Sequence, residues 1–281
     1  MIHKSIHFQN SPAQYLTVPQ DPFFEFLHNR LHDQTNFCHC TTRTGETQTH
    51  FSLMSPVLES LFVKLILASN SPRRRQLLAL TDWDFVVSAA DVDESQLENE
   101  SPADYVLRLA EKKARAIQAE ADTIILASDT TVVDGQNILG KPQDEAEAIA
   151  MLTRLRGRTH QVYTGVALFQ KSEDHILTDL CITDVPMRDY SDQEITSYVA
   201  TGDPLDKAGS YAIQHPDFRP VASMEGCYAS VMGLPLCHVV GMMRQMGIEP
   251  HADVPLNCQK LLEYDCPVYN SILNNTSLRG R

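Results

Sequence analysis

The sequence predicts an α/β fold in which helices flank a mixed, twisted sheet. Two short apolar runs, 61–69 and 123–128, are nearly continuous, as expected for strands that are buried on both faces. Two later segments, 160–170 and 175–190, alternate between apolar and polar residues like paired antiparallel strands. Helical patterns lie among these strands without strict strand-helix alternation, which indicates a mixed sheet and not a purely parallel one.

Each expected helix combines an amphipathic pattern with a recognisable start or stop signal. Pro72 occupies the first turn of the first helix, and Ser101-Pro102 opens the second. Ser191 and Glu194 have the spacing of a capping box. A turn and a short strand are expected at 134–142, before the third helix. The predicted helices are 73–80, 103–121, 144–157, 191–200 and 233–247, the last of which is expected to be the final helix.

Composition divides the chain into three parts. Residues 1–60 hold six of the eleven His and only one of the twelve Gly, and their periodicity is weak. They are interpreted as a poorly ordered extension, with the alternative that Met54 is the true start. Residues 61–250 are expected to form the folded domain. The segment 251–281 shows little periodicity and is interpreted as a C-terminal appendage.

The bulk composition excludes several function classes. The formal net charge of −13 gives no electrostatic footprint for nucleic acid. No segment approaches the ~20 apolar residues of a membrane span, and the N-terminus lacks the pattern of a secretory signal. The seven scattered cysteines are expected to be reduced thiols. We therefore expect a soluble cytoplasmic protein, and the sequence leaves a homodimer open.

The segment 69–75 is the first candidate site, because it places basic residues between a buried strand and a helix. A helix N-terminus offers free N–H groups, and the guanidinium groups of Arg73 and Arg74 grip phosphate through paired hydrogen bonds. In an acidic protein this is the expected local concentration of positive charge. On spacing alone, a basic solvated helix face explains the segment equally well. It is not a P-loop, because glycine is absent.

Asp129 is the second candidate, since it follows the apolar run 123–128 at the predicted carboxyl end of a strand. Open α/β sheets place ligands at such ends. Its carboxylate suits either a divalent cation or proton abstraction from water, and a turn-forming Asp is the alternative. Further candidate polar groups, each of which is more often a surface residue, are Lys113, Lys141, Lys207 and Gln214. Together these residues indicate phosphoryl-type chemistry on an anionic small molecule, and no more than that.

Eight short motifs resemble, in order and spacing, those of the Maf family over residues 64–248. The motifs are LILASNSPRRRQLL, VDE, LAEKKA, ASDTTV, LGKP, TGV, PLDKAGSYAIQ and VMGLPL. The resemblance implies a cytoplasmic nucleoside triphosphate pyrophosphatase that uses a divalent metal, Mg²⁺ or Mn²⁺, and cleaves between the α- and β-phosphates. It also implies a fold similar to the inosine-triphosphate pyrophosphatases, with a long sheet and a cleft between two lobes.

By the same resemblance, Asp129 falls on the family's catalytic acidic residue, as proton acceptor or as metal ligand. The implied substrate-binding residues are Ser69, Arg73, Arg74, Glu94, Lys113, Thr130, Lys141 and Gln214. Base specificity is assigned to Arg73, Thr130 and Gln214. The pair Asp129-Thr130 resembles the dTTP/UTP branch, whereas an Asp-Gln pair would resemble the 7-methyl-GTP branch. His215 departs from the family's usual glycine.

The preferred function is therefore hydrolysis of dTTP and UTP to the monophosphate and pyrophosphate, with modified pyrimidine nucleotides left open as further substrates. Two alternatives remain. One is a 7-methyl-GTP pyrophosphatase, and the other is a nucleotide-binding regulator of cell division, acting at the septum without significant turnover.

Overall fold

The computed structural model describes residues 64–274. The predicted N-terminal extension, 1–60, and the alternative start at Met54 lie outside the described residues, as does the beginning of the first apolar run. The division of the chain at residues 60 and 250 stays a prediction.

The core of the fold is a six-stranded mixed sheet in the order β2-β1-β3-β5-β6, with β4 paired to β3 beside this path. β1 pairs in parallel with β2 and β3, whereas the β3–β4, β3–β5 and β5–β6 pairs are antiparallel. The predicted mixed sheet is thus confirmed. The strands are β1 (Lys64–Leu67), β2 (Phe85–Val87), β3 (Thr123–Asp134), β4 (Asn137–Leu139), β5 (Thr159–Gln170) and β6 (His175–Pro186).

Four of the predicted helices begin at their sequence signals, whereas the helix predicted for 233–247 begins at Leu236. Ser71, Ser101 and Asp144 each accept a backbone N–H as N-caps, and Ser191 with Glu194 forms the predicted capping box. The described helices are α3 (Pro72–Leu78), α4 (Pro102–Ala116), α5 (Glu145–Leu155), α6 (Asp192–Val199), α7 (Tyr228–Val231), α8 (Leu236–Gln245), α9 (Val254–Leu262) and α10 (Tyr269–Asn274). Short 3₁₀ turns are η1 (Ala79–Thr81), η2 (Lys171–Glu173), η3 (Asp203–Asp206) and η4 (Ala208–Ser210).

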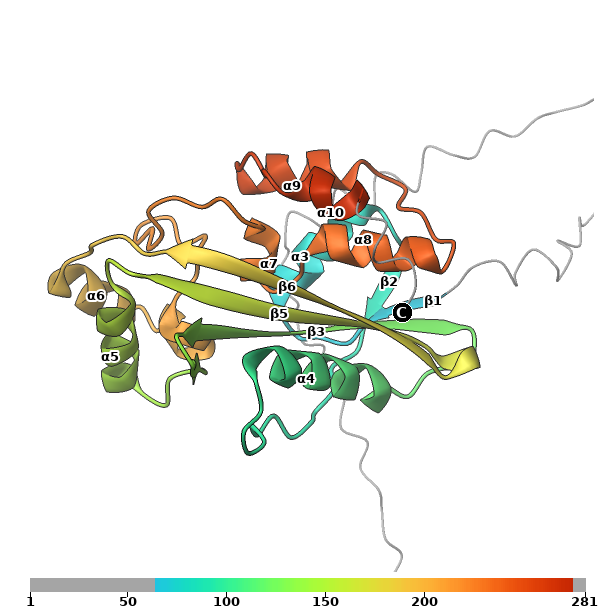
Figure 1. Cartoon of the computed structure of the whole chain (residues 1–281), viewed down its shortest axis with the longest axis horizontal. Coiled ribbons are helices and arrows are strands. Elements are labelled where there is room, and N and C mark those ends of the chain that lie inside the picture. Colours follow the sequence, from blue (N-terminus) through green and yellow to red (C-terminus); the bar gives the residue numbers. More distant parts are fainter. Residues whose placement is uncertain (1–63, 275–281) are drawn as a thin grey trace, which may run out of the picture. The chain divides into compact units, whose positions relative to one another are not determined.

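Helices cover both faces of the sheet because side chains alternate along its strands. In β3, Ile125 and Ala127 face a small cluster with the alanines of α4, whereas Ile124 and Leu126 face the larger cluster that includes α8. Figure 1 shows α4 on one side of the sheet and α7 and α8 on the other, with α9 and α10 beyond α8. Gly165 lets α4 approach β5 closely, since a Cβ there would lie 2.6 Å from the Val106 carbonyl oxygen.

Several sequence expectations about element boundaries are wrong, and one of them is the helix predicted for 103–121, which ends at Ala116. β3 does not end at Asp129 but continues to Asp134, so this carboxylate lies inside a strand and pairs with Gly165 of β5. The polar run Ser128–Thr131 interrupted the apolar pattern, although Ser128, Asp129 and Thr131 are buried. In addition, α8 is not the last helix, because α9 and α10 follow it and pack on the larger cluster.

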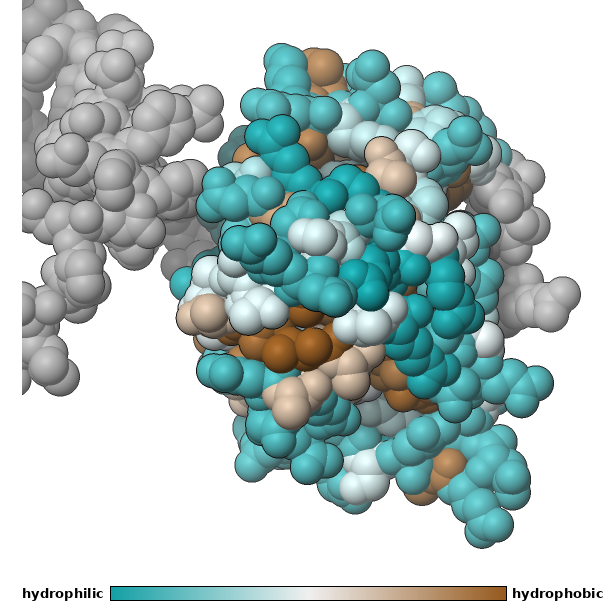
Figure 2. All heavy atoms as spheres, turned by 90° about the vertical axis from the view of Figure 1, so that its left-hand side faces the viewer, coloured by the Kyte–Doolittle hydropathy of each residue, from teal (hydrophilic) through white to brown (hydrophobic). Residues whose placement is uncertain are grey.

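One face of the surface is mainly polar. Figure 2 shows the end of the sheet that carries α5 and α6, and it is mainly hydrophilic with small apolar areas. Within residues 64–274, no helix has the length and apolar character that a membrane crossing requires.

Candidate active site

A break in strand pairing along one edge of β3 creates the main cavity of the described chain. β1 pairs with β3 only as far as Leu126, and β4 begins to pair at Val132, so residues 127–131 have no partner strand on that edge. A cavity of about 700 Å³ lies at this gap, a size that suits a small-molecule ligand. The sequence-predicted residues all line it, namely Ser69, Arg73, Arg74, Glu94, Lys113, Asp129, Thr130, Lys141 and Gln214.

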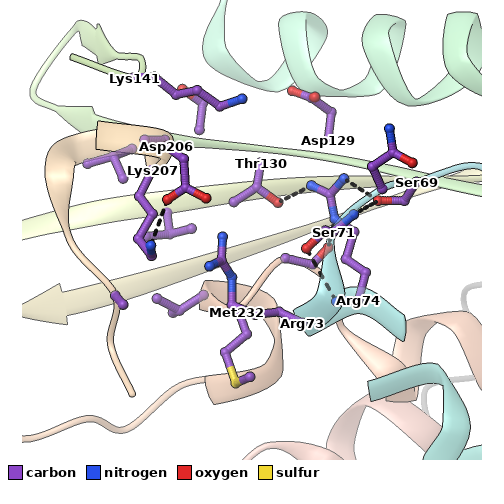
Figure 3. Close-up of a pocket in the computed structure, with 18 of the residues that line it drawn as sticks. Ser69, Ser71, Arg73, Arg74, Asp129, Thr130, Lys141, Asp206, Lys207 and Met232 are labelled. Atoms are coloured by element: carbon purple, nitrogen blue, oxygen red, sulfur yellow. Dashed lines mark hydrogen bonds and ion pairs between the residues drawn. The ribbon is translucent and has the colours of Figure 1, made fainter. Parts of the chain in front are cut away.

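The gap in strand pairing at residues 127–131 explains how adjacent residues of β3 can line the same cavity. Asp129 points to the α4 face of the sheet, where it meets Lys113. Thr130 points to the opposite face, where it meets Arg74. Both side chains reach the cavity because no neighbouring strand separates the two faces here. Figure 3 shows Arg73, Arg74 and Ser69 on one side of this space, with Lys141, Asp206 and Lys207 across from them.

Arg74 holds three segments of the site together. Its Nε donates to the Gly233 carbonyl (2.9 Å), Nη1 to Ser69 Oγ (3.5 Å) and Nη2 to Thr130 Oγ1 (3.3 Å). Gly233 has φ +107°, and a Cβ there would lie 3.0 Å from Arg74 Nε, so glycine is required. Burial lowers the pKa of Arg74, an effect that the Asp129 carboxylate opposes, and the guanidinium stays charged at neutral pH.

Arg73 and Lys141 are the uncommitted cations of the cavity. Within the described part of the chain, neither side chain has a hydrogen bond or an ion pair with another residue, although both line the cavity. Lys141 is exposed in the turn between β4 and α5. These two groups therefore keep their full hydrogen-bonding capacity for an anionic ligand.

A lysine bridges two carboxylates on the other side of the strand gap. Lys113 Nζ lies 2.6 Å from Asp129 Oδ1 and 2.6 Å from Glu94 Oε1. Asp129 is 7% exposed, so its charge needs this partner, whereas the Glu94 side chain is half exposed. Partial burial raises the pKa of Glu94, but the hydrogen bond and charge of Lys113 lower it, and the net shift is downward.

Helix α4 fixes the loop that carries Glu94. Three of its side chains donate to three consecutive backbone carbonyls: Lys112 to Asp93 (2.9 Å), Tyr105 to Glu94 (3.0 Å) and Arg108 to Ser95 (3.0 Å). The donors are spaced so that they lie on one face of the helix. The loop has no regular structure of its own, and these contacts place its carboxylate beside Lys113.

The paired carboxylates of Glu94 and Asp129 fit a hard divalent cation. Both direct an oxygen at one ammonium group, and carboxylate oxygens are the ligands that Mg²⁺ and Mn²⁺ prefer. Within residues 64–274 no three His, Cys, Asp or Glu side chains form a metal-binding group. This agrees with the way Mg²⁺ is usually held, by one or two carboxylates together with phosphate oxygens of the substrate.

The opposite wall of the cavity is built from turns. Lys207, a candidate cation in the sequence, is not free, because Nζ is held by Asp203 Oδ1 (2.9 Å), Asp206 Oδ1 (2.6 Å) and the Asp203 carbonyl (2.6 Å). Its side chain is buried, and its charge is neutralised inside the wall. Gln214 remains exposed at the end of this wall.

Several cavity residues had no individual signal in the sequence. Tyr105, Asp206 and Tyr211 line the cavity. Gly233 acts through its carbonyl, which also accepts a hydrogen bond from Ser128 Oγ at 2.7 Å. The sequence does not show which backbone carbonyls act as acceptors. The VMGLPL motif was the one sequence feature that indicated this segment.

Comparison with known families decides the relationship of the chain. The family described as Maf-like protein matches residues 64–246. The chain belongs to the Maf family. Its Maf region comprises the sheet, helices α3 to α8 and all nine predicted site residues, whereas α9 and α10 lie beyond it.

Curated members of the Maf family are similar over nearly their whole length. A protein named dTTP/UTP pyrophosphatase from Geotalea uraniireducens is 46% identical over 184 residues, which are 65% of this chain and 95% of the relative. One of the same name from Myxococcus xanthus is 48% identical over 185 residues, or 66% of this chain and 93% of the relative. Among solved structures, a HAM1 protein from Coxiella burnetii is 18% identical with a TM-score of 0.34 and covers 46% of this chain and 75% of that one.

Proposed function

We propose that the chain is a nucleoside triphosphate pyrophosphatase that hydrolyses dTTP and UTP to the monophosphate and pyrophosphate. The observation that carries the proposal is the joining of Asp129, Glu94 and Lys113 with the uncommitted Arg73 and Lys141 in one cavity. Maf relatives at 44–48% identity that bear the name dTTP/UTP pyrophosphatase support the same activity.

Charge neutralisation is the main task of such a site. A nucleoside triphosphate carries several negative charges, and catalysis of phosphoryl chemistry depends mostly on stabilising the charge on the transferred group. Arg73 and Lys141 bind phosphate oxygens from opposite sides of the cavity, and Arg74 adds its fixed positive charge. The chain as a whole has a net charge of −13, so the cations of the cavity are a local concentration of positive charge for a polyanionic substrate.

Asp129 activates the attacking water in this proposal. Lys113 pairs with the carboxylate and orients it, and the buried position on β3 fixes it relative to the phosphates. Water gives up a proton to the carboxylate as its oxygen bonds to the α-phosphorus, and pyrophosphate leaves with the electrons of the broken P–O bond.

A divalent cation is the proposed cofactor, held by Asp129 and Glu94 together with phosphate oxygens. When bound, it supplies charge to the phosphates and lowers the pKa of coordinated water. Lys113 bridges the two carboxylates in the structure, and its ammonium group also lines the cavity where the phosphates bind.

The hydroxyl of Thr130 supports the dTTP/UTP assignment. Thr164 Oγ1 donates to the Ser230 carbonyl (2.9 Å), so Thr130 donates to Thr164 (3.1 Å) and accepts from Arg74. The longer side chain of glutamine would displace Arg74 from this position. Thr130 therefore acts on specificity by fixing Arg74, while Arg73 and the exposed amide of Gln214 read the substrate directly.

Pyrophosphate release from a panel of nucleotides tests the proposal. The panel comprises dTTP, UTP, dCTP, GTP and 7-methyl-GTP, each with Mg²⁺ or Mn²⁺. We expect fast release from dTTP and UTP. Release mainly from 7-methyl-GTP would overturn the base assignment but keep the chemistry. Binding of nucleotide without release from any of them would favour the alternative of a regulator without turnover.

A further inference from the structure

The cavity wall opposite Arg73 consists of residues Asp206, Lys207, Ala208, Tyr211, Ala212, Ile213 and Gln214, here termed the 206–214 wall. It contains no strand and no α-helix, only the turns η3 and η4 and an irregular segment. These turns have only scattered backbone hydrogen bonds, such as that from the Gly209 N–H to the Gly140 carbonyl (3.0 Å), so side-chain contacts contribute to holding the wall in place. The groups that hold this wall therefore decide the shape of the cavity.

A single buried hydroxyl connects the two ends of the wall. Tyr198, near the end of α6, donates its OH to Asp203 Oδ2 (2.7 Å) and accepts the Ala212 backbone N–H (3.0 Å). Asp203 precedes the wall and holds Lys207 through Oδ1, while Ala212 lies two residues before Gln214. Tyr198 is 3% exposed and does not line the cavity.

The ring of Tyr198 is fixed by the segment that follows the wall. It stacks on Phe218 with ring centroids 4.3 Å apart, and it meets the edge of His215 at 4.7 Å. His215 Nδ1 accepts the Phe218 N–H (3.0 Å), which closes the turn after Gln214. The residue that departs from the family's usual glycine thus packs against the tyrosine that spans the wall.

We propose that Tyr198 is a positioning residue that sets the 206–214 wall, and with it Gln214, at the spacing required to bind the nucleoside part of the substrate. The inference rests on the proposed function, because it assigns a role in recognising that substrate. Among residues 64–274, Arg73, Arg74 and Lys113 have no hydrogen bond to Tyr198, Asp203 or Ala212, so loss of the Tyr198 hydroxyl leaves the hydrogen bonds of these cations intact.

Tyr198→Phe isolates the hydroxyl, and Tyr190→Phe is the matched control. Tyr190 is 1% exposed, donates its OH to the Leu152 carbonyl (2.8 Å) and touches Phe218, but it has no bond to the wall. We expect Tyr198→Phe to raise KM for dTTP about 10-fold with kcat within about 2-fold of wild type. Inhibition by inorganic pyrophosphate should not change. Tyr190→Phe should leave KM unchanged, because a purely structural loss reduces the amount of folded enzyme.

Calorimetry measures the same effect without turnover. The dissociation constant of dTTP is compared between Asp129→Asn proteins with and without each tyrosine change. Equal dissociation constants for the two tyrosine variants, or weaker inhibition by pyrophosphate in Tyr198→Phe, would overturn the inference. Failure of the wild type to release pyrophosphate would instead refute the proposed function and leave this comparison valid. If Tyr198→Phe does not fold, His215→Ala is the test variant, and its KM for dTTP should rise about 3-fold. An unchanged KM in that variant would overturn the inference.

Discussion

The two walls of the cavity are built by different means. On the wall that carries Ser69, Arg74 and Asp129, functional side chains project from strand β3, from helices α3 and α4 and from the loop after β1, and they bond to one another across elements. The 206–214 wall is a series of turns, and its fixed points, Tyr198 and Lys207, act from within the protein. The contrast indicates that Arg74, Lys113 and Asp129 are held rigidly by one another, whereas the groups proposed for base recognition depend on a few contacts that substitution can loosen.

The largest effect is expected at the rigid wall, for Asp129→Asn. The amide keeps the shape of the side chain but cannot take a proton, so turnover of dTTP should fall by ~10²-fold or more while nucleotide still binds. Steady-state pyrophosphate release and calorimetric binding measure the two quantities. Turnover equal to wild type would remove Asp129 from the mechanism. Loss of binding together with turnover would make it a binding residue instead.

Replacing Arg74 and Arg73 by lysine, one at a time, distinguishes an arginine that holds the site together from one that is available to bind substrate. Arg74→Lys loses the bond from Nε to the Gly233 carbonyl and the link to Thr130, which should lower the free energy of unfolding by about 1.5–3 kcal/mol together with activity. Arg73→Lys is the matched control, since Arg73 makes no bond within the described chain, and it should raise KM without a change in stability. Urea unfolding measures the free energy of unfolding of both variants. Equal values for the two would mean that Arg74 does not hold the site together.

A pH effect on stability tests the support of the second wall. His160 Nε2 lies 2.8 Å from the OH of Tyr211, and burial lowers the pKa of His160 to about 4, with Asp134 opposing the shift. The unfolded chain binds a proton below pH ~6.5 and the folded chain does not, so the contribution of His160 is complete above that pH and is lost as pH falls toward 4.

His160→Gln should therefore lose less stability than wild type when the pH is lowered from about 7 to about 4.5, by on the order of 2 kcal/mol. Urea unfolding at the two pH values measures the difference, in which contributions from other groups cancel. An identical loss in both proteins would show that His160 takes up its proton in the folded state as readily as in the unfolded one.

The rigid wall was also the more predictable from sequence. Strand and helix periodicity placed β1, α3 and α4, and the N-caps followed from Ser and Pro at the expected positions. The motif match selected nine residues that share one cavity, although it did not give their contacts. The pairing of Lys113 with both Asp129 and Glu94 depends on two elements meeting in space, which no local pattern encodes.

The second wall could not be predicted in the same detail. From the sequence, Lys207 is predicted to be a free cation. In the structure, Asp203 and Asp206 form ion pairs with its ammonium group. In the sequence, Tyr198 looks like any core residue of an amphipathic helix. Its proposed role depends on the hydrogen-bond partners of its hydroxyl, which only the structure shows. The continuation of β3 past Asp129 was hidden because its buried polar groups are satisfied by tertiary hydrogen bonds, such as that between Ser128 and Gly233.

The position of bond cleavage tests the central claim most directly. Hydrolysis of dTTP in ¹⁸O-labelled water, followed by mass analysis of the products, shows which phosphorus the water attacks. We predict thymidine monophosphate that carries the label, together with unlabelled pyrophosphate. Thymidine diphosphate with labelled inorganic phosphate would contradict the proposal, because it would show attack at the terminal phosphate and make the site a phosphatase.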